Sequence, residues 1–230
     1  MTKAVFFDVG QTLIFDDPPV PEVFARVAQR MGHNVSVRDV EPCMADVHAY
    51  YQGEYLRDGD FWCVHERAVQ IWLDMYAMMA DYCGIKRDVG TLAQTVYDEY
   101  LLPQNWSIYP DVNACFQGLK RRGFSLGIVS NWAATLEDLF RKLGLLPYID
   151  EVVASAAVGY RKPDPAIFEV AMERLGVTPE DSVHVGDLPE ADGAGAAAAG
   201  IRPIIIDRNG VLDDCPYERI SLLTDLVSML

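Results

Sequence analysis

The feature that most constrains the fold of this 230-residue chain is the regular alternation of short apolar strands and helices in its second half. After a helix predicted at 112–122, strands are predicted at 124–131, 151–155, 181–187 and 202–207, with helices between them at 134–144, 164–176 and 191–200. Neighbouring parallel strands need such crossover helices. The pattern therefore predicts an α/β fold with a doubly wound parallel sheet.

Another strand and a long helical stretch precede this alternation. Residues 3–9 are a continuous apolar and β-branched run that ends at Gly10, which predicts a short buried strand. The pattern is then helical, with candidate helices at 21–32, 36–59, 61–84 and 87–102. We expect an α/β core made of residues 1–15 and 104–230 and a helical insert made of residues 16–103.

Charge and cysteine usage narrow the class of partner. The formal net charge is −15, from 19 Lys and Arg against 34 Asp and Glu, so the chain repels nucleic acid and anionic lipid surfaces. Its five cysteines form no CxxC pair, which fits a reducing cytosol and argues against a disulfide framework or structural zinc. We expect no signal peptide, because the first apolar stretch runs straight into Asp8, and no uncharged run approaches the roughly 20 residues that span a bilayer. We therefore expect a cytoplasmic monomer or homodimer without nucleic-acid or membrane partners.

Polar side chains stand where the predicted strands end, and ligands of open parallel sheets bind beyond those ends. The residues are Asp8, Ser130 and Asn131, Lys162, and Asp187 with Asp192 five residues later. Two carboxylates and a carbonyl suit Mg²⁺, whereas a hydroxyl and an ammonium can hold phosphoryl oxygens. A carboxylate can attack phosphorus and form an aspartyl phosphate. Each residue alone also fits a turn or a helix cap, so the prediction depends on their combined order.

Four stretches of the sequence resemble the haloacid dehalogenase-like (HAD) superfamily. They are FFDVGQTL (6–13), IYPDVNACFQGLKRRG (108–123), IVSN (128–131) and the long stretch from GYRKPDP to AAAAG (159–200). The chain is similar to subfamily I, in which a helical cap is inserted after the first strand. The resemblance implies a Rossmann-like HAD core with a cap domain, and a hydrolase.

The resemblance also implies roles for single residues. Asp8 is the expected nucleophile, Ser130 binds the phosphoryl group, and Lys162 bridges nucleophile and substrate. The expected Mg²⁺ ligands are Asp8, Asp187 and the carbonyl of Gly10, and Asp192 supports the metal or the lysine. Gln11, Thr12 and Asn131 are the expected substrate-binding residues.

Gly10 departs from the family pattern. Phosphatases of the family usually carry a second aspartate there, which protonates the leaving oxygen and later deprotonates water. General acid–base catalysis is worth roughly 10²–10⁴-fold, so its loss handicaps a phosphatase unless another group substitutes. The candidate substitutes are Asp16, Asp17, His48 and His65, although for the two histidines a place on a helix surface or in a core is the more common explanation.

Several activities fit a chain without this aspartate. A Mg²⁺-dependent phosphatase fits if its substrate, a small phosphorylated metabolite, has a good leaving group, as acyl phosphates do. A 2-haloacid dehalogenase needs no acid but no Mg²⁺ either, which the retained Asp187 disfavours. A phosphonatase needs an early cap lysine, whereas Lys86 is the only lysine between Phe15 and Ser107. A weak or non-enzymatic protein that binds a ligand or a protein partner is the alternative from another class.

The insert is expected to set the substrate, but its motifs do not name one. Its aromatic residues could form a core or line a pocket, and a core is the simpler expectation; they are Phe61, Trp62, Trp72 and Tyr76. The proline-marked stretches 16–21 and 103–110 join the insert to the core, and hinges of moving lids commonly lie at such joins.

Overall fold

The computed structural model describes residues 3–57 and 59–230. Met1, Thr2 and Asp58, which the predicted core and insert include, lie outside the described residues. The chain divides into two compact units. One contains Met1–Phe15 and Ile108–Leu230 and is called the α/β unit below, and the other contains Asp16–Ser107 and is called the helical unit.

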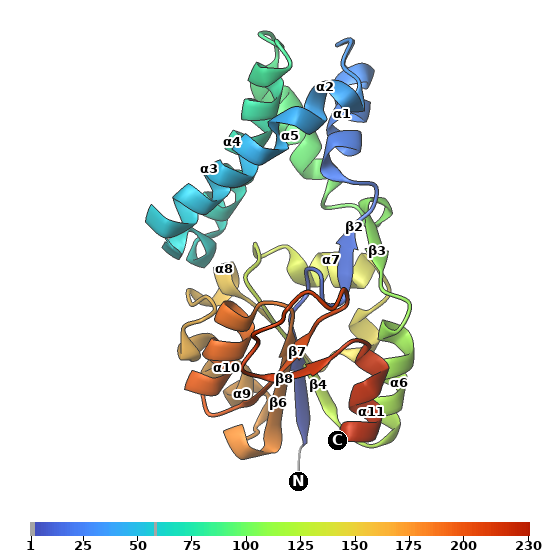
Figure 1. Ribbon diagram of the computed structural model, residues 1–230, viewed down its shortest axis with the longest axis vertical. Coiled ribbons are helices and arrows are strands. Elements are labelled where there is room, and N and C mark those ends of the chain that lie inside the picture. The colour runs from blue at the N-terminus through green and yellow to red at the C-terminus, as the bar shows by residue number, and fades with distance from the viewer. Residues whose placement is uncertain (1–2, 58) are drawn as a thin grey trace. The chain divides into compact units, whose positions relative to one another are not determined.

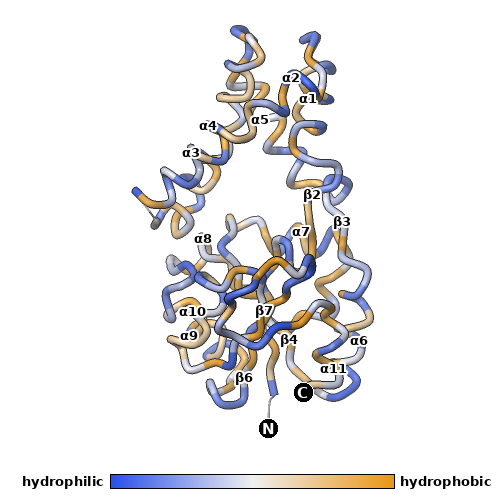
Figure 2. The backbone as a smooth tube through the Cα atoms, in the orientation of Figure 1, coloured by the Kyte–Doolittle hydropathy of each residue, from blue (hydrophilic) through white to orange (hydrophobic). Residues whose placement is uncertain are grey.

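A six-stranded sheet forms the centre of the α/β unit (Figure 1). In the order β5-β4-β1-β6-β7-β8, the strands are Glu151–Ala154, Ser125–Ser130, Ala4–Phe7, Ser182–Gly186, Arg202–Ile206 and Glu218–Ile220. All five neighbouring pairs are parallel. The four central strands are largely buried, and Figure 2, which colours the chain by residue hydropathy, shows hydrophobic residues along the centre of the sheet. The predicted doubly wound parallel sheet is confirmed.

Helices cover both faces of this sheet (Figure 1). Helices α9 (Pro165–Leu175) and α10 (Ala194–Ala198) pack on one face, where Phe6 and Val129 are fully buried. Helices α6 (Val112–Arg121) and α11 (Leu226–Met229) pack together on the other. The unit also contains α7 (Leu136–Lys142) and α8 (Ser155–Val158). Residues 191–200, predicted as one helix, divide between α10 and a π-helical turn, η6 (Pro189–Gly193).

The helical unit is built from five α-helices around its own core. They are α1 (Val20–Arg30), α2 (Val37–Val40), α3 (Met44–Arg57), α4 (His65–Tyr82) and α5 (Val89–Glu99), and Figure 1 labels each of them. Phe61, Trp62 and Tyr76 belong to the core and Trp72 packs against it, as expected from the sequence. Within the ranges 3–57 and 59–230, no helix is both long enough and apolar enough to cross a membrane.

One buried acidic residue of the helical unit is fully paired. Glu99 lies next to Arg30 and Arg26, and the Nδ2 of Asn105 donates a hydrogen bond of 3.0 Å to its carboxylate. Burial alone raises the pKa of Glu99, but the hydrogen bonds from Arg30 and Asn105 and the charges of both arginines outweigh burial. The pKa therefore lies below its ordinary value, and the ionised form is favoured in the folded unit.

Several short elements do not follow from the sequence pattern. Strands β2 (Ile14–Asp16) and β3 (Trp106–Ile108) pair as a separate sheet that contains both points where the chain passes between the units. Strand β8 and helices α8 and α11 were also not predicted. Each of these elements has only three or four residues, so periodicity carries little information about it.

Candidate active site

Three of the predicted site residues, Asp8, Ser130 and Asp187, lie at one edge of the sheet because their strands are in register. Phe7 of β1 pairs with Ile128 of β4 and with Val185 of β6. Asp8 follows Phe7, and its backbone N–H donates to the Val185 carbonyl at 2.8 Å. Ser130 ends β4 and Asp187 follows β6. The carboxyl ends of three adjacent strands thus deliver these side chains to one place.

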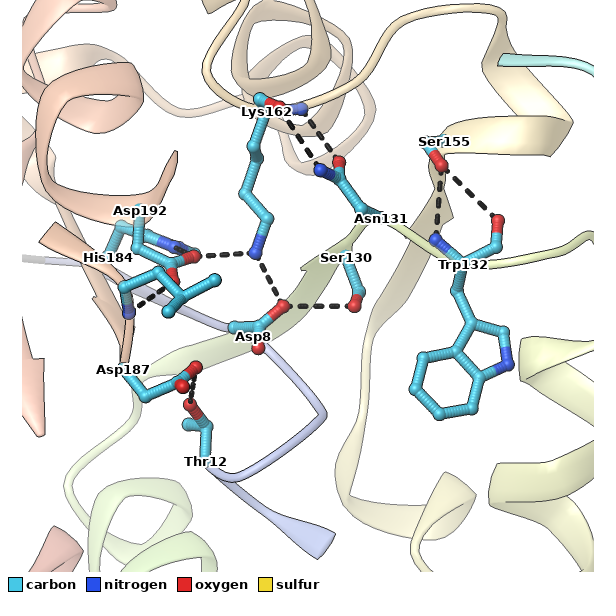
Figure 3. Close-up of polar contacts among 11 residues, drawn as sticks. Asp8, Thr12, Ser130, Asn131, Trp132, Ser155, Lys162, His184, Asp187 and Asp192 are labelled. Atoms are coloured by element: carbon cyan, nitrogen blue, oxygen red, sulfur yellow. Dashed lines mark hydrogen bonds and ion pairs between the residues drawn. The ribbon is translucent and has the colours of Figure 1, made fainter. Parts of the chain in front are cut away.

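Lys162 links two carboxylates at this edge, as Figure 3 shows. Its ammonium group contacts Oδ1 of Asp8 and lies 2.5 Å from Oδ1 of Asp192. The hydroxyl of Ser130 donates to the same Asp8 oxygen at 2.9 Å. The four residues Asp8, Ser130, Lys162 and Asp192 are all buried, and Lys162 is only 2% exposed. Among the described residues, both hydrogen bonds to the Asp8 carboxylate end on Oδ1, and Oδ2 accepts none.

A second set of contacts holds Asp192 in place. It lies in the π-helical turn η6, a feature often found at functional sites. His184 Nε2 lies 2.9 Å from Oδ1 of Asp192, and the N–H of Leu188 donates to Oδ2 at 3.0 Å. A Cβ at Gly186 would lie 2.1 Å from the Asp192 carboxyl carbon, so this position requires glycine. His184 was not predicted as a site residue, although a histidine inside an apolar strand marks it in the sequence.

The charges of the cluster shift the pKa of each member. Burial lowers the pKa of Lys162, but the charges of Asp192 and Asp8 outweigh burial and raise it. Burial raises the pKa of Asp192, but the Lys162 charge and the His184 contact lower it overall. For Asp8, burial dominates and the pKa is raised. Burial and the negative charges of Asp8 and Asp192 raise the pKa of Asp187 to about 8.

The raised pKa values of Asp8 and Asp187 come first from burial and then from the negative charge of neighbouring carboxylates. Asp8, Asp187 and Asp192 place carboxylate oxygens within 4.8 Å of one another, with Lys162 as the one ammonium in contact with this group among the described residues. Clustered carboxylate oxygens are the ligands that Mg²⁺ prefers, and a divalent cation would remove the repulsion that raises the pKa of Asp187. The donor set therefore fits a magnesium ion. The metal role of the Gly10 carbonyl stays a prediction.

The predicted substrate-binding residues have different surroundings. The Asn131 side chain accepts from the Lys162 N–H at 2.7 Å and donates to the Lys162 carbonyl at 3.0 Å, so it ties the lysine backbone to β4 (Figure 3). The buried Thr12 hydroxyl donates to Asp187 at 3.4 Å. Gln11 has a left-handed backbone, with φ at 56°, and its Oε1 accepts from the Tyr109 hydroxyl at 3.1 Å.

Residue 10 has room for a side chain. The backbone of Gly10 lies outside the left-handed region, so a residue other than glycine is not strained there. Among the described residues, a Cβ would meet only the Trp132 ring, at an ordinary contact distance of 3.9 Å. The backbone does not require glycine at this position, so the fold does not exclude a carboxylate there.

The four candidate substitutes for that carboxylate all belong to the helical unit, and they are Asp16, Asp17, His48 and His65. Asp17 accepts a hydrogen bond of 2.6 Å from the Ser107 hydroxyl. Burial raises the pKa of Asp16. Their part in proton transfer stays a prediction.

The α/β unit is thus a parallel sheet with buried carboxylates, a lysine and a serine at its carboxyl edge. Residues 2–200 match the haloacid dehalogenase-like hydrolase family. The chain belongs to this family, which confirms the family and the enzyme class predicted from the four motifs. The subfamily stays a prediction.

Individual proteins of known sequence or structure extend this likeness. The chain is 31% identical over 215 residues to haloacid dehalogenase-like hydrolase domain-containing protein 3 of Danio rerio, covering 89% of this chain and 84% of that protein. It is 27% identical over 246 residues to ribulose-1,5-bisphosphate 5-phosphatase of Halopiger xanaduensis, covering 99% and 100%. The crystal structure of 2-haloacid dehalogenase from Pseudomonas syringae superimposes with a TM-score of 0.70 at 25% identity, covering 99% and 97%.

Proposed function

We propose that the chain is a Mg²⁺-dependent phosphatase that acts on a small phosphorylated metabolite. The observation that carries this proposal is the Asp8 carboxylate. Lys162 and Ser130 hold one of its oxygens, and Asp8 belongs to a carboxylate cluster that fits Mg²⁺. The phosphatase that the chain matches over nearly its full length supports the same class.

The proposed reaction proceeds through Asp8. Oδ2 of Asp8 forms a bond to phosphorus, the ester bond breaks, and the leaving oxygen departs with the electron pair. Lys162 and Ser130 keep the other oxygen fixed, so the nucleophile loses little entropy on attack. Water then hydrolyses the aspartyl phosphate and releases phosphate. Asp8 and Asp187 would hold Mg²⁺, which would supply positive charge to the phosphoryl oxygens when bound.

Gly10 determines which esters suit this site. Without a carboxylate at residue 10, the leaving oxygen departs as an anion unless another group protonates it. Aryl and acyl phosphates release stabilised anions, whereas alkyl phosphates release a poor alkoxide. The proposed enzyme therefore favours substrates with good leaving groups.

The helical unit is proposed to be a cap domain that moves over the site. In support, the chain passes between the units at Phe15–Asp16, where the proline-marked stretch 16–21 begins, and at Ser107–Ile108, inside the stretch 103–110. Hydrogen exchange of both stretches, measured with and without Mg²⁺ and vanadate, tests the hinge. Unchanged exchange despite confirmed binding would indicate a static cap.

A 2-haloacid dehalogenase is the second candidate, favoured by the likeness to the Pseudomonas syringae structure and by Gly10. Its carboxylate would attack carbon and release halide, which needs no proton. The cluster of Asp8, Asp187 and Asp192 carboxylates, which fits a divalent cation, argues for the metal-dependent phosphatase instead.

A screen of phosphorylated metabolites and 2-haloacids, with and without Mg²⁺, tests both candidates. We expect release of phosphate that requires Mg²⁺, and a burst of covalent phosphate from an acyl-phosphate donor that is absent in Asp8→Asn. Release of halide without Mg²⁺ would identify a dehalogenase. The absence of turnover with every substrate would favour a binding protein.

A further inference from the structure

The loop between Asp8 and β2 is anchored by residues from distant parts of the chain. Arg208, which follows β7, donates through Nη2 to the Thr12 carbonyl at 2.7 Å. The N–H of Tyr109 donates to the Leu13 carbonyl at 3.0 Å. The Tyr109 hydroxyl holds the Gln11 side chain at 3.1 Å. Successive residues of the loop are therefore tied to Arg208 or Tyr109, all within the α/β unit.

Arg208 and Tyr109 also hold each other. The guanidinium carbon of Arg208 lies 3.7 Å from the centroid of the Tyr109 ring, a close cation–π contact. Asp111 also holds the Arg208 guanidinium, because its carboxylate oxygens lie 3.1 and 3.2 Å from the two Nη atoms. Asp111 in turn accepts from the Leu223 N–H at 2.7 Å. The paired arginine is thus a rigid support with few alternative positions.

The loop needs such a support because its own backbone is strained. Gln11 adopts a left-handed conformation, which is unfavourable for a residue other than glycine. A conformation of this kind persists only where surrounding contacts impose it. The strained residue lies between Gly10, whose carbonyl is a predicted metal ligand, and Thr12, whose hydroxyl donates to Asp187.

We infer that Arg208 and Tyr109 are positioning residues, which fix residues 10–14, the end of the loop and the first residue of β2, relative to Asp8 and Asp187. Neither residue needs to touch the reacting atoms. Their effect on turnover rests on the proposed phosphatase function, but their effect on the loop does not.

Two measurements on the full chain test this inference. Arg208→Met removes the guanidinium and keeps a long side chain, and we expect amide exchange at residues 11–14 to become about tenfold faster, the effect of one lost hydrogen bond. Exchange in β4 should not change. With an aryl phosphate and Mg²⁺, kcat should fall roughly 10–100-fold with little change in KM, the usual effect of a misplaced catalytic group. Arg202→Met, which removes an exposed pair with Glu218, is the matched control and should match the native protein in both measurements.

Tyr109→Phe keeps the ring and removes only the hydroxyl that holds Gln11, so it decides the question if Arg208→Met does not fold. We expect kcat to fall about threefold to tenfold, since one hydrogen bond is lost. A folded Arg208→Met or Tyr109→Phe protein with native kcat and native loop exchange would overturn the inference. Equally faster exchange in β4 would also overturn it, because Arg208 would then act only on global stability. If the native protein hydrolyses no phosphate ester, the proposed function fails while the exchange comparison still decides whether the loop is positioned.

Discussion

Both units bury acidic side chains, but they balance the charge differently. In the helical unit, Glu99 has two arginines and an asparagine as partners, and its pKa is lowered. In the α/β unit, Lys162 pairs with two of the three clustered carboxylates, Asp8 and Asp192. Burial and the negative charges of these two raise the pKa of the third, Asp187, to about 8. Breaking a balanced buried pair destabilises a fold, whereas an unbalanced cluster of buried charges with shifted pKa values marks a candidate functional site.

This difference predicts which property each substitution changes. A substitution at the unbalanced cluster should alter turnover or the metal requirement and leave stability nearly unchanged. A substitution at the balanced pair should do the reverse.

The largest effect is expected for Asp8→Asn. Turnover should fall by about 10⁴-fold, because the amide cannot form the covalent intermediate. The melting temperature should stay near that of the native protein, since asparagine keeps the shape and Lys162 keeps Asp192 as a partner. Steady-state kinetics and calorimetry measure both quantities, with the exposed Asp138→Asn as control. Unchanged turnover would show that Asp8 is not the nucleophile.

Asp187→Asn should act on the metal. Loss of one carboxylate ligand should raise the Mg²⁺ concentration for half-maximal activity by roughly tenfold to hundredfold. Removal of Mg²⁺ from the native protein with a chelator should abolish turnover. Titration of activity with Mg²⁺ measures the shift, and Asp214→Asn, at an exposed position, is the control. An unchanged requirement would exclude Asp187 as a ligand.

Gly10→Asp should restore the missing proton donor. Because the backbone and the space at residue 10 accept a side chain, we expect a folded protein. Turnover of alkyl phosphates should rise by up to roughly 10²-fold and that of aryl phosphates much less. Gly10→Asn, which has the same shape but no acid, is the matched control. Equal gains with Asp and Asn would show that proton donation is not the cause.

Glu99→Gln tests the balanced side of the comparison. We expect the unfolding free energy to fall by about 1–2 kcal/mol, because hydrogen bonds to a charged acceptor are lost. The lowered pKa stabilises the fold fully above the ordinary value of 4.5, and this contribution is lost as the pH falls through the folded-state pKa. Denaturant unfolding at pH 7 and at acid pH should therefore show the difference only at pH 7. Asp81→Asn, at an exposed pair with Lys86, should change stability at neither pH.

The sequence predicts those parts of the molecule that depend on local pattern. Asp8 and Asp187 follow apolar strands and Ser130 ends one, so parallel pairing alone brings them together. The small-residue stretch that includes Gly195 is explained by packing, because a Cβ there would lie 3.0 Å from the Pro163 backbone. Such residues can be recognised from the order of strands and helices along the chain.

Other residues could not be assigned because tertiary contacts determine their role. The substrate-binding role of Asn131 stays a prediction, and the sequence pattern does not show that its carboxamide holds the Lys162 backbone. Arg208 and Tyr109 lie about a hundred residues apart and meet only in the folded α/β unit. Strand β8 has three residues and is defined by its pairing with β7, which no local pattern shows.

A leaving-group series on the native protein tests most directly the proposal that Asp8 attacks phosphorus while no acid assists departure. With Mg²⁺ present, kcat/KM is measured for aryl and alkyl phosphates of similar size whose leaving groups differ in pKa. We predict a steep fall in rate as the leaving-group pKa rises, with aryl esters fastest. A flat dependence would contradict the proposal, because another group would then already supply the proton that Gly10 cannot.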